Sequence, residues 1–309
     1  VTKTMLWNTY KSVNDAIFAI EKVFFPRPAK GIPAAYAIHH KADNKMIGTC
    51  DFIWVNWEEG TAEIGYCLNR KYWNRGYATR ACRGLIRFGF EHLGLKLIEI
   101  CHDELNPASG RVIVKSGFHP VGKRFHKGVG KEIPYYELRA DEIAILKADS
   151  FDTAEKGIVH HRCWMETYSG LIGSDFLASK TPEHFIEIAR KYLPNTLLAV
   201  IGGKIVGFAN YDVARDDDLP GIGEVRAIYV LKDFQARGVG KKLMDACFSG
   251  MKEYPRISIW VLDGNDHAIG FYQHLGFCLD GKRKAVHVDE KTVLNESRMQ
   301  VDNPYFQKK

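Results

Sequence analysis

The sequence predicts an α/β fold built from two tandem domains. Its length of 309 residues suits two domains of ordinary size. Four pairs of landmark residues recur at nearly one separation, and a repeat of that length is a whole domain rather than a short solenoid unit. The separation is 162 residues for Gly76 and Gly238, and 159 residues for Gly48 and Gly207, Asn106 and Asn265, and Gly117 and Gly276. We therefore expect one domain over residues 1–141 and a second over residues 142–309.

The second half shows the clearer order of elements. Asp152 with Glu155 reads as a capping box that opens a helix reaching about Tyr168, and Thr181-Pro182-Glu183 reads as the start of another helix. Apolar runs predict the strands, with Gly202-Gly203 as a hairpin turn between the first two. The expected order is strands at Leu197–Ile201, Ile205–Val213 and Gly223–Val230, a helix from Gly238, a strand at Ile257–Val261, a helix from Asn265 and two closing strands.

The first half repeats this order from Ser12 onward. Strands are expected near Ala35–His39, Lys45–Val55, Ala62–Leu68 and Leu97–Ile100, and the apolar spacing of Ala81–His92 predicts a helix. Its final strand is expected at Tyr135–Leu138, and the second half starts with a strand at Ile143–Leu146. The first half lacks such an opening strand. Because the chain begins at Val1 without a Met, we expect N-terminal residues to be missing.

The segment Gln235–Gly240 carries the most specific chemical signal. It reads Q-x-x-G-x-G and opens a helix directly after the strand residues Ala227–Val230. Two glycines let the backbone wrap closely around an anion, and the new helix offers unpaired N–H groups and the positive end of its dipole. A pyrophosphate suits such a loop. The dinucleotide-binding and Walker A fingerprints both fail, because Lys241-Lys242 follows instead of a third glycine or a Gly-Lys-Ser/Thr sequence.

A second motif, Asn265–Phe277, follows in the order Asn, Phe-Tyr, Gly-Phe. Together the two motifs resemble the GNAT family of acetyl-CoA-dependent N-acyltransferases. Trp73–Thr79 and Asn106–Phe118 repeat the pattern in the first half, which resembles the ribosomal-protein N-terminal acetyltransferase branch. The resemblance implies two GNAT-like domains, each with a central twisted mixed sheet flanked by helices, and acetyl-CoA as the cosubstrate.

The resemblance also assigns residues that contact coenzyme A. In this family the pantetheine arm lies between two splayed parallel strands, and backbone N–H groups of the fourth strand receive the carbonyl oxygen. These strands correspond to Val225–Val230 with Ile257–Val261, and to Ile64–Leu68 with Leu97–Cys101. The expected contacts are Tyr229, Val230, Gln235, Arg237, Gly238, Val239, Gly240, Lys241 and Asn265 in the second half, and Leu68, Arg75, Gly76, Tyr77, Ala78, Thr79 and Asn106 in the first.

Two side chains of the second half match catalytic positions of the family. Tyr272 corresponds to the Tyr that protonates the departing thiolate, and a neutral phenol can donate that proton at pH 7. Glu224 begins the fourth strand, where many members place the carboxylate that deprotonates the acceptor amine. The structural alternatives are a half-buried aromatic residue for Tyr272 and an ordinary exposed charge for Glu224.

The first half departs from the family pattern. Glu63 is the equivalent of Glu224. However, Trp73 occupies the Gln/Arg position of the loop, and Val112 replaces the Tyr that acts as the general acid. In the ribosomal-protein branch, residues matching Asn106 and Ser109 contact coenzyme A or assist proton transfer. The alternative for Ser109 is a hydroxyl that satisfies backbone donors at a helix N-terminus.

Acceptor recognition is expected on the first helices and nearby loops. Trp164 and Tyr168 are the candidate substrate-binding residues, because aromatic rings suit a cationic amine. The run Asp216–Asp218 is either a second attraction for that amine or a solvated loop. His160-His161 and His267 have no metal-ligand spacing, so we expect no metal.

Composition sets bounds. No apolar run is long enough to span a bilayer, which predicts no membrane partner. The 7 cysteines are scattered singly without C-x-x-C, which argues against disulfides and zinc and favours a reducing cytoplasm. Residues 1–141 hold 21 Lys and Arg against 14 Asp and Glu, but no nucleic-acid motif accompanies this charge. Nucleic acid is therefore not an expected partner, and an oligomer stays open.

The sequence thus predicts an acetyl-CoA-dependent N-acetyltransferase. Its acceptor is the primary amine of a small molecule or a protein N-terminus, and the second half holds the better-supported site. In the alternative interpretation one domain, the first more than the second, is a silent structural or ligand-sensing module.

Overall fold

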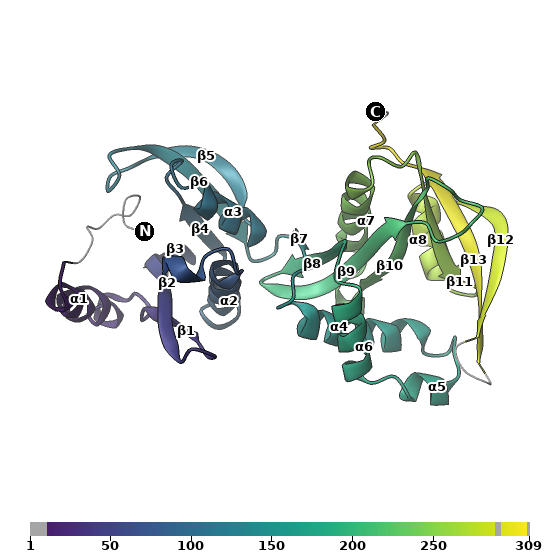
Figure 1. The fold of residues 1–309 in the computed structure, drawn as a ribbon, viewed down its shortest axis with the longest axis horizontal. Helices are drawn as coiled ribbons and strands as arrows, with labels where there is room; N and C mark the ends of the chain where they lie inside the picture. Colours follow the sequence, from purple (N-terminus) through teal and green to yellow (C-terminus); the bar gives the residue numbers. More distant parts are fainter. Residues whose placement is uncertain (1–10, 288–291, 308–309) are drawn as a thin grey trace. The chain divides into compact units, whose positions relative to one another are not determined.

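The computed structural model describes residues 11–287 and 292–307, and the chain divides into two compact units. The first unit comprises Val1–Ala144 with Ile201–Lys204, and the second comprises Ile145–Val200 with Ile205–Lys309. Each unit contains one mixed sheet with flanking helices (Figure 1).

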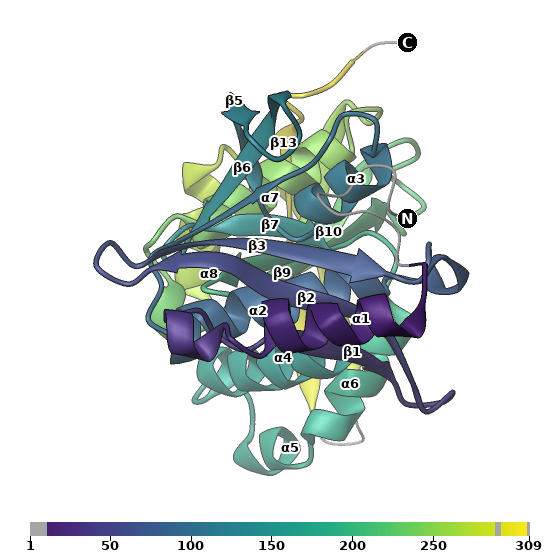
Figure 2. The same cartoon turned by 90° about the vertical axis from the view of Figure 1, so that its left-hand side faces the viewer.

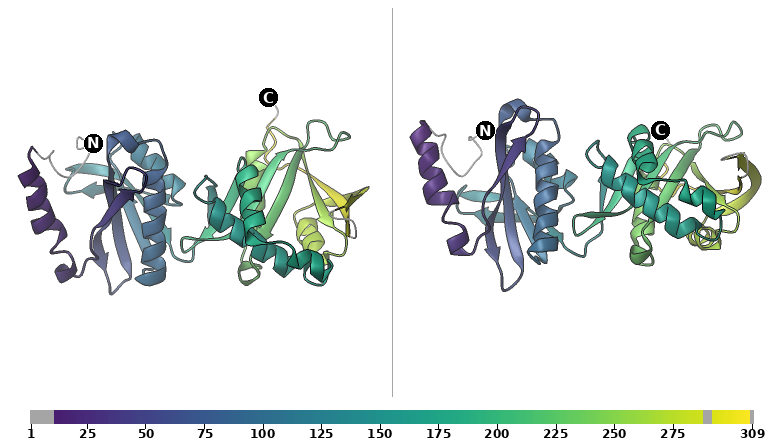
Figure 3. Two further views of the ribbon diagram at one scale, coloured as in Figure 1. Left: turned by 60° about the horizontal axis from the view of Figure 1, so that its bottom comes forward. Right: turned by 90° about the horizontal axis from the view of Figure 1, so that it is seen from below.

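The first unit has a six-stranded sheet in the order β1-β2-β3-β4-β6-β5. Strands β3 and β4 run parallel, and the other neighbours are antiparallel. Helices α1 and α2 lie on opposite faces of this sheet (Figure 3), and Figure 2 views it with α1 in front. The elements are α1 Val13–Ala19, β1 Tyr36–His40, β2 Lys45–Asn56, β3 Thr61–Leu68, α2 Tyr77–His92, β4 Leu97–Cys101, α3 Pro107–Lys115, β5 His119–His126 and β6 Lys131–Arg139.

The second unit repeats this sheet and adds one strand, giving the order β12-β13-β11-β10-β9-β8-β7. Strands β10 and β11 are the parallel pair. Helices α4 and α6 lie side by side on one side of the sheet and α7 lies on the other (Figure 1). The elements are β7 Ala144–Lys147, α4 Thr153–Tyr168, α5 Ser174–Ala178, α6 Pro182–Lys191, β8 Thr196–Ile201, β9 Lys204–Val213, β10 Gly223–Val230, α7 Val239–Gly250, β11 Arg256–Leu262, α8 Asp266–His274, β12 Cys278–His287 and β13 Val293–Asp302.

Local sequence signals predicted where most helices and strands begin, with one exception. Thr181 caps α6 by accepting a hydrogen bond from the His184 N–H over 3.3 Å, as expected. The capping box expected at Asp152 and Glu155 is wrong, because Asp152 makes no side-chain cap hydrogen bond to α4. Asp152 instead accepts from the Asp149 N–H at 2.8 Å, and Glu155 accepts from the Ile205 N–H at 3.3 Å. Both side chains therefore hold neighbouring chain segments.

The parallel strands of each unit pair only at their beginnings. Thr61–Glu63 of β3 pair with Leu97–Glu99 of β4, and Gly223–Val225 of β10 pair with Ile257–Ile259 of β11. Beyond these residues the described strands continue without pairing to each other. The unpaired halves leave backbone N–H and C=O groups between them, as the splayed strands of the sequence analysis require.

The glycines of the repeat have a packing role beside these strands. Gly48 lies opposite Leu68, and Gly207 lies opposite Val230. A Cβ on Gly48 would lie 2.1 Å from the Cys67 carbonyl oxygen, and a Cβ on Gly207 would lie 2.7 Å from the carbonyl oxygen of Tyr229. Only glycine fits where one strand lies this close to its neighbour's backbone.

Candidate active sites

The loop before α7 and the loop before α2 have the same backbone shape. Gly238 and Gly76 are the N-caps of these helices, with φ values of 83° and 78°. Two residues earlier, Ala236 and Asn74 are also left-handed, with φ values of 55° and 59°. Neither helix has a side-chain cap hydrogen bond, and an uncapped helix N-terminus suits an anion.

One hydrogen bond fixes each loop to the end of its strand. The Gln235 side chain donates from Nε2 to the carbonyl oxygen of Val230 over 3.0 Å. In the first unit Trp73 donates from Nε1 to the carbonyl oxygen of Leu68 over 2.8 Å. The indole thus makes the contact that the amide makes in the second unit, so the replacement of Gln by Trp conserves the loop anchor.

A cavity of about 360 Å³ in the second unit brings most predicted residues together. It is bounded by the loop before α7, the parted strands β10 and β11, and α8. The predicted residues that line it are Glu224, Tyr229, Val230, Gln235, Gly238, Gly240, Lys241, Asn265, Tyr272 and Tyr168. The cavity therefore brings the N-terminus of α7 together with Tyr272 and Glu224.

Three predicted residues do not line this cavity. Val239 is 1% exposed and belongs to the core, and Arg237 is exposed, with its guanidinium carbon 5.3 Å from the centre of the Phe234 ring. Trp164 lies behind Tyr168, with ring centroids 4.5 Å apart. Trp164 therefore supports Tyr168, whose hydroxyl in turn lies 3.0 Å from that of Tyr229.

Tyr272 is held on the buried face of α8. Asn265 caps this helix by accepting a hydrogen bond from the Ala268 N–H over 3.2 Å. Phe271, which directly precedes Tyr272, packs against Gly240. A Cβ on Gly240 would lie 3.0 Å from the Phe271 ring, so the second glycine of the loop allows α7 and α8 to approach. Burial raises the pKa of Tyr272, which keeps its hydroxyl protonated at neutral pH.

Glu224 is buried and bound on both oxygens. The Arg215 guanidinium donates to Oε1 over 2.7 Å and to Oε2 over 3.2 Å, and the Arg215 backbone N–H also donates to Oε2 at 3.2 Å. Glu224 is 2% exposed, so it is not the ordinary exposed charge of the alternative interpretation. The carboxylate lines the cavity together with its arginine partner.

Several cavity residues escaped the sequence analysis. Arg226 is a bulge residue in β10, since the register with β9 shifts between Val225 and Ala227. Its Nη1 lies 3.0 Å from Asp212, whereas its buried Nε has no hydrogen-bond partner. Lys284 lies 3.9 Å above the Trp260 ring. No local motif marks these cations, because strand register alone brings them to the cavity.

Two of the three aspartates in the run Asp216–Asp218 pair with a buried arginine. Arg298, which is 4% exposed, donates to Asp218 over 2.8 and 2.9 Å and to Asp216 over 3.3 Å. Asp216 also accepts from the Trp260 Nε1 at 3.0 Å. These two carboxylates neutralise a buried guanidinium, which neither interpretation of the sequence foresaw.

A cavity of about 590 Å³ occupies the matching position in the first unit. The predicted residues that line it are Leu68, Gly76, Tyr77, Ala78, Thr79, Asn106 and Ser109, whereas Arg75 does not. Arg75 lies with its guanidinium carbon 6.0 Å from the centre of the Tyr72 ring. Each unit therefore has such a loop, a pair of parted strands and a cavity of its own beside the loop.

The position expected to donate a proton differs between the units. Counted from the N-caps Asn106 and Asn265, the residue that matches Tyr272 is Ile113, so the earlier assignment to Val112 is wrong by one position. Ile113 is fully buried in the core. A hydroxyl is still present nearby, because Tyr66 lies 2.8 Å from the Oγ of Ser109, and both line the cavity.

Glu63 faces a smaller cavity of about 140 Å³ that shares Tyr66, Asn106 and Ser109 with the larger one. Its Oε2 accepts from the Trp54 Nε1 over 2.8 Å, and its Oε1 accepts from the Cys101 thiol over 3.4 Å. Burial and then the nearby Glu63 raise the pKa of Cys101 to about 12. The Glu63 carboxylate thus lies next to the larger cavity and accepts hydrogen bonds from Trp54 and Cys101.

Comparison with known proteins agrees with this geometry. The acetyltransferase (GNAT) domain matches residues 2–119, and the acetyltransferase (GNAT) family matches residues 161–277. The uncharacterized N-acetyltransferase p20 of Bacillus licheniformis is 32% identical over 138 residues, which cover 44% of this chain and 77% of p20. The putative ribosomal N-acetyltransferase YdaF of Bacillus subtilis is 36% identical over 81 residues, or 25% of this chain and 44% of YdaF.

Two solved structures each cover about half of this chain. A putative ribosomal-protein-serine acetyltransferase from Vibrio cholerae is 21% identical with a TM-score of 0.40, covering 45% of this chain and 81% of its own. An N-acetyltransferase from Thermoplasma acidophilum, solved in complex with coenzyme A, is 19% identical with a TM-score of 0.42, covering 52% of this chain and 99% of its own.

Fold and sites define a protein of two acyltransferase units, each an α/β domain with a mixed sheet. The chain belongs to the GNAT family of acetyltransferases and carries two such domains in tandem. It is an N-acetyltransferase, and acetyl-CoA is its cosubstrate. Within the described residues, no helix is both long enough and apolar enough to span a bilayer.

Proposed function

We propose that the second unit transfers the acetyl group of acetyl-CoA to a primary amine of a small molecule or a protein N-terminus. One observation carries the proposal. The open N-terminus of α7, the parted strands β10 and β11, and the Tyr272 hydroxyl all line one cavity. The cosubstrate supplies an activated acetyl group as a thioester.

The loop end of the cavity suits the pyrophosphate of the cosubstrate. The N–H groups that follow Gly238 have no side-chain cap, and the helix dipole adds a partial positive charge at the same place. Lys241 lines this end and pairs with Asp245 over 2.8 Å. Backbone groups therefore do most of the binding, and Lys241 adds one cation beside them.

The other end of the cavity suits acid–base work. Tyr272 holds its proton on a buried hydroxyl, so it can protonate a departing thiolate. The unpaired N–H groups of β10 lie where they can polarise a carbonyl oxygen. Glu224, held by Arg215, is the proposed acceptor of the amine proton, directly or through water.

The first unit is proposed as a second acetyl-CoA site. Its loop repeats the backbone shape and the strand anchor of the second unit. The Tyr66 and Ser109 hydroxyls, 2.8 Å apart, replace Tyr272 as the proton source. A silent first unit remains the competing interpretation, and the relative named as a ribosomal N-acetyltransferase adds protein N-termini to the acceptors worth testing.

Titration of acetyl-CoA into the intact chain, by calorimetry, tests both sites. We expect two binding events, one abolished by Gly238→Glu and the other by Gly76→Glu. Gly221→Glu is the matched control, because Gly221 also has a positive φ, 72°, but lies outside both cavities. Unchanged acetyl-CoA binding by the Gly238→Glu variant would contradict the assignment of this loop as the pyrophosphate-binding site. A single event that only Gly238→Glu abolishes would mark the first unit as silent.

The acceptor needs a separate experiment. Polyamines, aminoglycosides, amino acids and peptides with free N-termini form a panel for acetyl-CoA turnover. Turnover of none of these amines by the intact chain would contradict the proposed acceptor class.

A cytoplasmic setting is also proposed, since all seven cysteines are free and four are buried.

A further inference from the structure

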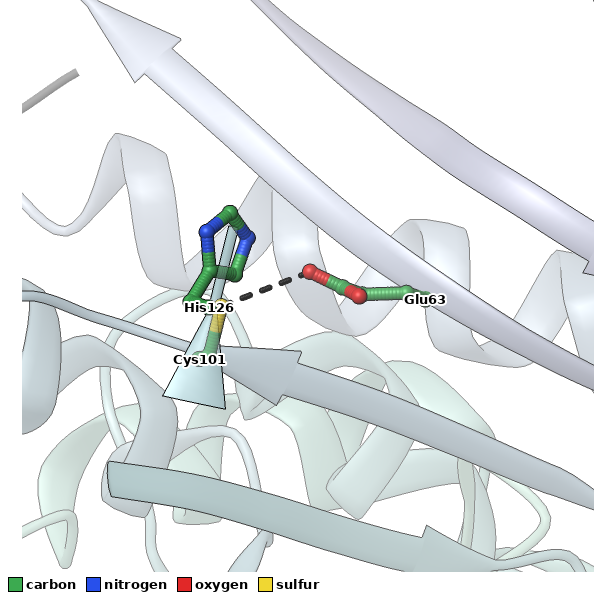
Figure 4. A group of neighbouring side chains, drawn as sticks. All are labelled: Glu63, Cys101 and His126. Carbon is green, nitrogen blue, oxygen red and sulfur yellow. Dashed lines mark hydrogen bonds between the residues drawn. The ribbon is translucent and has the colours of Figure 1, made fainter. Parts of the chain in front are cut away.

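The smaller cavity of the first unit contains three side chains that are typical metal ligands. Glu63 comes from β3, Cys101 from the end of β4 and His126 from the end of β5, and Figure 4 shows them facing one another. One ligand atom from each lies within 4.8 Å of the other two. No metal was expected from the spacing of His160-His161, His267 and the cysteines. Glu63, Cys101 and His126 share no short spacing, and the sheet brings them together.

We propose that Glu63, Cys101 and His126 bind a divalent ion of the Zn²⁺ class, with a fourth position open to the cavity. A carboxylate, a thiolate and an imidazole form the mixed oxygen, sulfur and nitrogen set that Zn²⁺ prefers, whereas Mg²⁺ and Ca²⁺ prefer oxygen alone. The Cys101 thiol would release its proton to solvent as the ion binds. Three protein ligands with an open fourth position are the arrangement of reactive zinc sites, whereas structural zinc sites close all four.

The distances suit such an ion. With zinc bonds of about 2.0–2.3 Å, tetrahedral ligand atoms lie about 3.4–3.7 Å apart. The Cys101 Sγ and Glu63 Oε1 atoms are already 3.4 Å apart. All three ligand atoms lie within 4.8 Å of one another, so an ion would need a shift of about 1 Å at most to bring them to bonding distance.

Neighbouring groups support the three ligands. Trp54 donates to the Oε2 of Glu63 over 2.8 Å, which orients the carboxylate and leaves Oε1 toward Cys101. The His126 ring stacks on Tyr135 with an interplanar angle of 28°, and its buried Nδ1 has no hydrogen-bond partner. An ion would give this nitrogen the partner that it lacks.

The cavity leaves room for an exchangeable ligand. Its volume of about 140 Å³ exceeds what one ion needs, and a water molecule occupies only about 30 Å³ of liquid. The cavity shares Tyr66, Asn106 and Ser109 with the larger one, so the fourth position lies beside the proposed acetyl-CoA site. The metal site itself stands on the three side chains, whether or not the first unit transfers acetyl groups.

Titration of Co²⁺ into the reduced, metal-free full-length chain tests the proposal. Co²⁺ reports a thiolate ligand by an ultraviolet charge-transfer band and a tetrahedral site by its visible spectrum. We expect one equivalent to give both signals, Zn²⁺ to displace Co²⁺, and Mg²⁺ to have no effect. Cys101→Ser should abolish the charge-transfer band, and Glu63→Gln and His126→Ala should weaken binding about tenfold or more.

Cys278→Ser is the matched control, because Cys278 is the exposed cysteine among the described residues and lies on the other unit. A band that persists in Cys101→Ser or vanishes in Cys278→Ser would overturn the site, and so would the absence of any band in the wild-type chain. Should Cys101→Ser fail to fold, alkylation decides the question. In the wild-type chain Zn²⁺ should protect Cys101 and leave Cys278 reactive, and equal labelling of Cys101 with and without Zn²⁺ would refute the proposal.

Discussion

Arg215 holds both carboxylate oxygens of Glu224, with donor distances of 2.7 and 3.2 Å. The pair is asymmetric, since the Glu224 side chain is 2% exposed and the Arg215 side chain is 60% exposed. The buried Glu224 carboxylate therefore depends on the exposed Arg215 guanidinium to neutralise its charge. The free-energy cost of removing a residue should consequently differ between the two positions.

We expect Arg215→Met to lower the free energy of unfolding of the second unit by about 1–2 kcal/mol, because it leaves a buried carboxylate without its cation. Glu224→Gln in the Arg215→Met background should recover part of that loss, since the amide carries no charge. Urea denaturation of the two single variants and the double variant gives the coupling energy. Strictly additive effects would show that the two side chains do not interact in solution.

Tyr272→Phe should lower turnover about 10²- to 10⁴-fold, the usual contribution of a general acid, with little change in acetyl-CoA affinity. Burial raises the pKa of Tyr272, so the wild-type chain should keep this contribution into the alkaline range. Steady-state kinetics with calorimetry measures both effects. Tyr305→Phe, at an exposed tyrosine, is the control, and equal turnover of the two variants would reject the acid role.

Trp73→Phe should weaken acetyl-CoA binding by the first unit roughly threefold to tenfold, because it removes the hydrogen bond to Leu68 that anchors the loop. Trp73→Gln should restore affinity, since Gln235 makes the same bond in the second unit. Trp57→Phe is a matched control that also loses an indole hydrogen bond, to Gly31, but outside the cavity. Binding by calorimetry in the Gly238→Glu background isolates the first unit, and equal loss in the Phe and Gln variants would disprove the anchor.

The elements and the loops could be predicted because their causes are local. Thr181 caps α6 through a residue three positions on, and the positive φ of Gly238 follows from the turn in which it lies. The internal repeat then carried these local signals from the second unit to the first. The helix α5, Ser174–Ala178, was missed, since five residues hold too little periodicity to detect.

The electrostatic partners could not be predicted, because the register of the paired strands brings them together and their spacing in the sequence does not reveal it. Arg298 meets Asp218 across 80 positions of sequence, and Cys101 meets Glu63 across 38. A shift of one residue in any strand would reverse the faces of these side chains. Residues that lie within motifs could therefore be predicted from the sequence, whereas Arg215, in a loop without a motif, could not.

Ala236→Asn should stabilise the second unit by about 0.5–1 kcal/mol. Ala236 is exposed and has a φ of 55°, a left-handed conformation that costs an ordinary residue about 1–2 kcal/mol and costs Asn less. The matching residue of the first unit, Asn74, already has this conformation. Urea denaturation measures the gain, and Ala154→Asn, at an exposed helical position on α4, should have the opposite sign. Destabilisation by Ala236→Asn would contradict the assignment of backbone strain to this position.

The buried Lys156 of α4 should make the stability of the second unit depend on alkaline pH. Burial lowers the pKa of Lys156 from 10.5 to about 8, and its Nζ lies 3.9 Å above the Phe208 ring. At about 1.4 kcal/mol per pKa unit, burial of the charged form costs about 3 kcal/mol. This cost is fully present below pH 8, where both the folded and the unfolded chain hold the proton.

Between pH 8 and 10.5 the unfolded chain binds a proton that the folded chain has released, so stability rises with pH and the cost disappears above this window. Lys156→Met should therefore stabilise the unit by about 2–3 kcal/mol at pH 7 and by progressively less as the pH rises through the window. Urea denaturation at several pH values measures the difference, with Lys252→Met at an exposed lysine as the control. A stabilisation that stays constant across the window would show that the ammonium group is solvated in the folded chain.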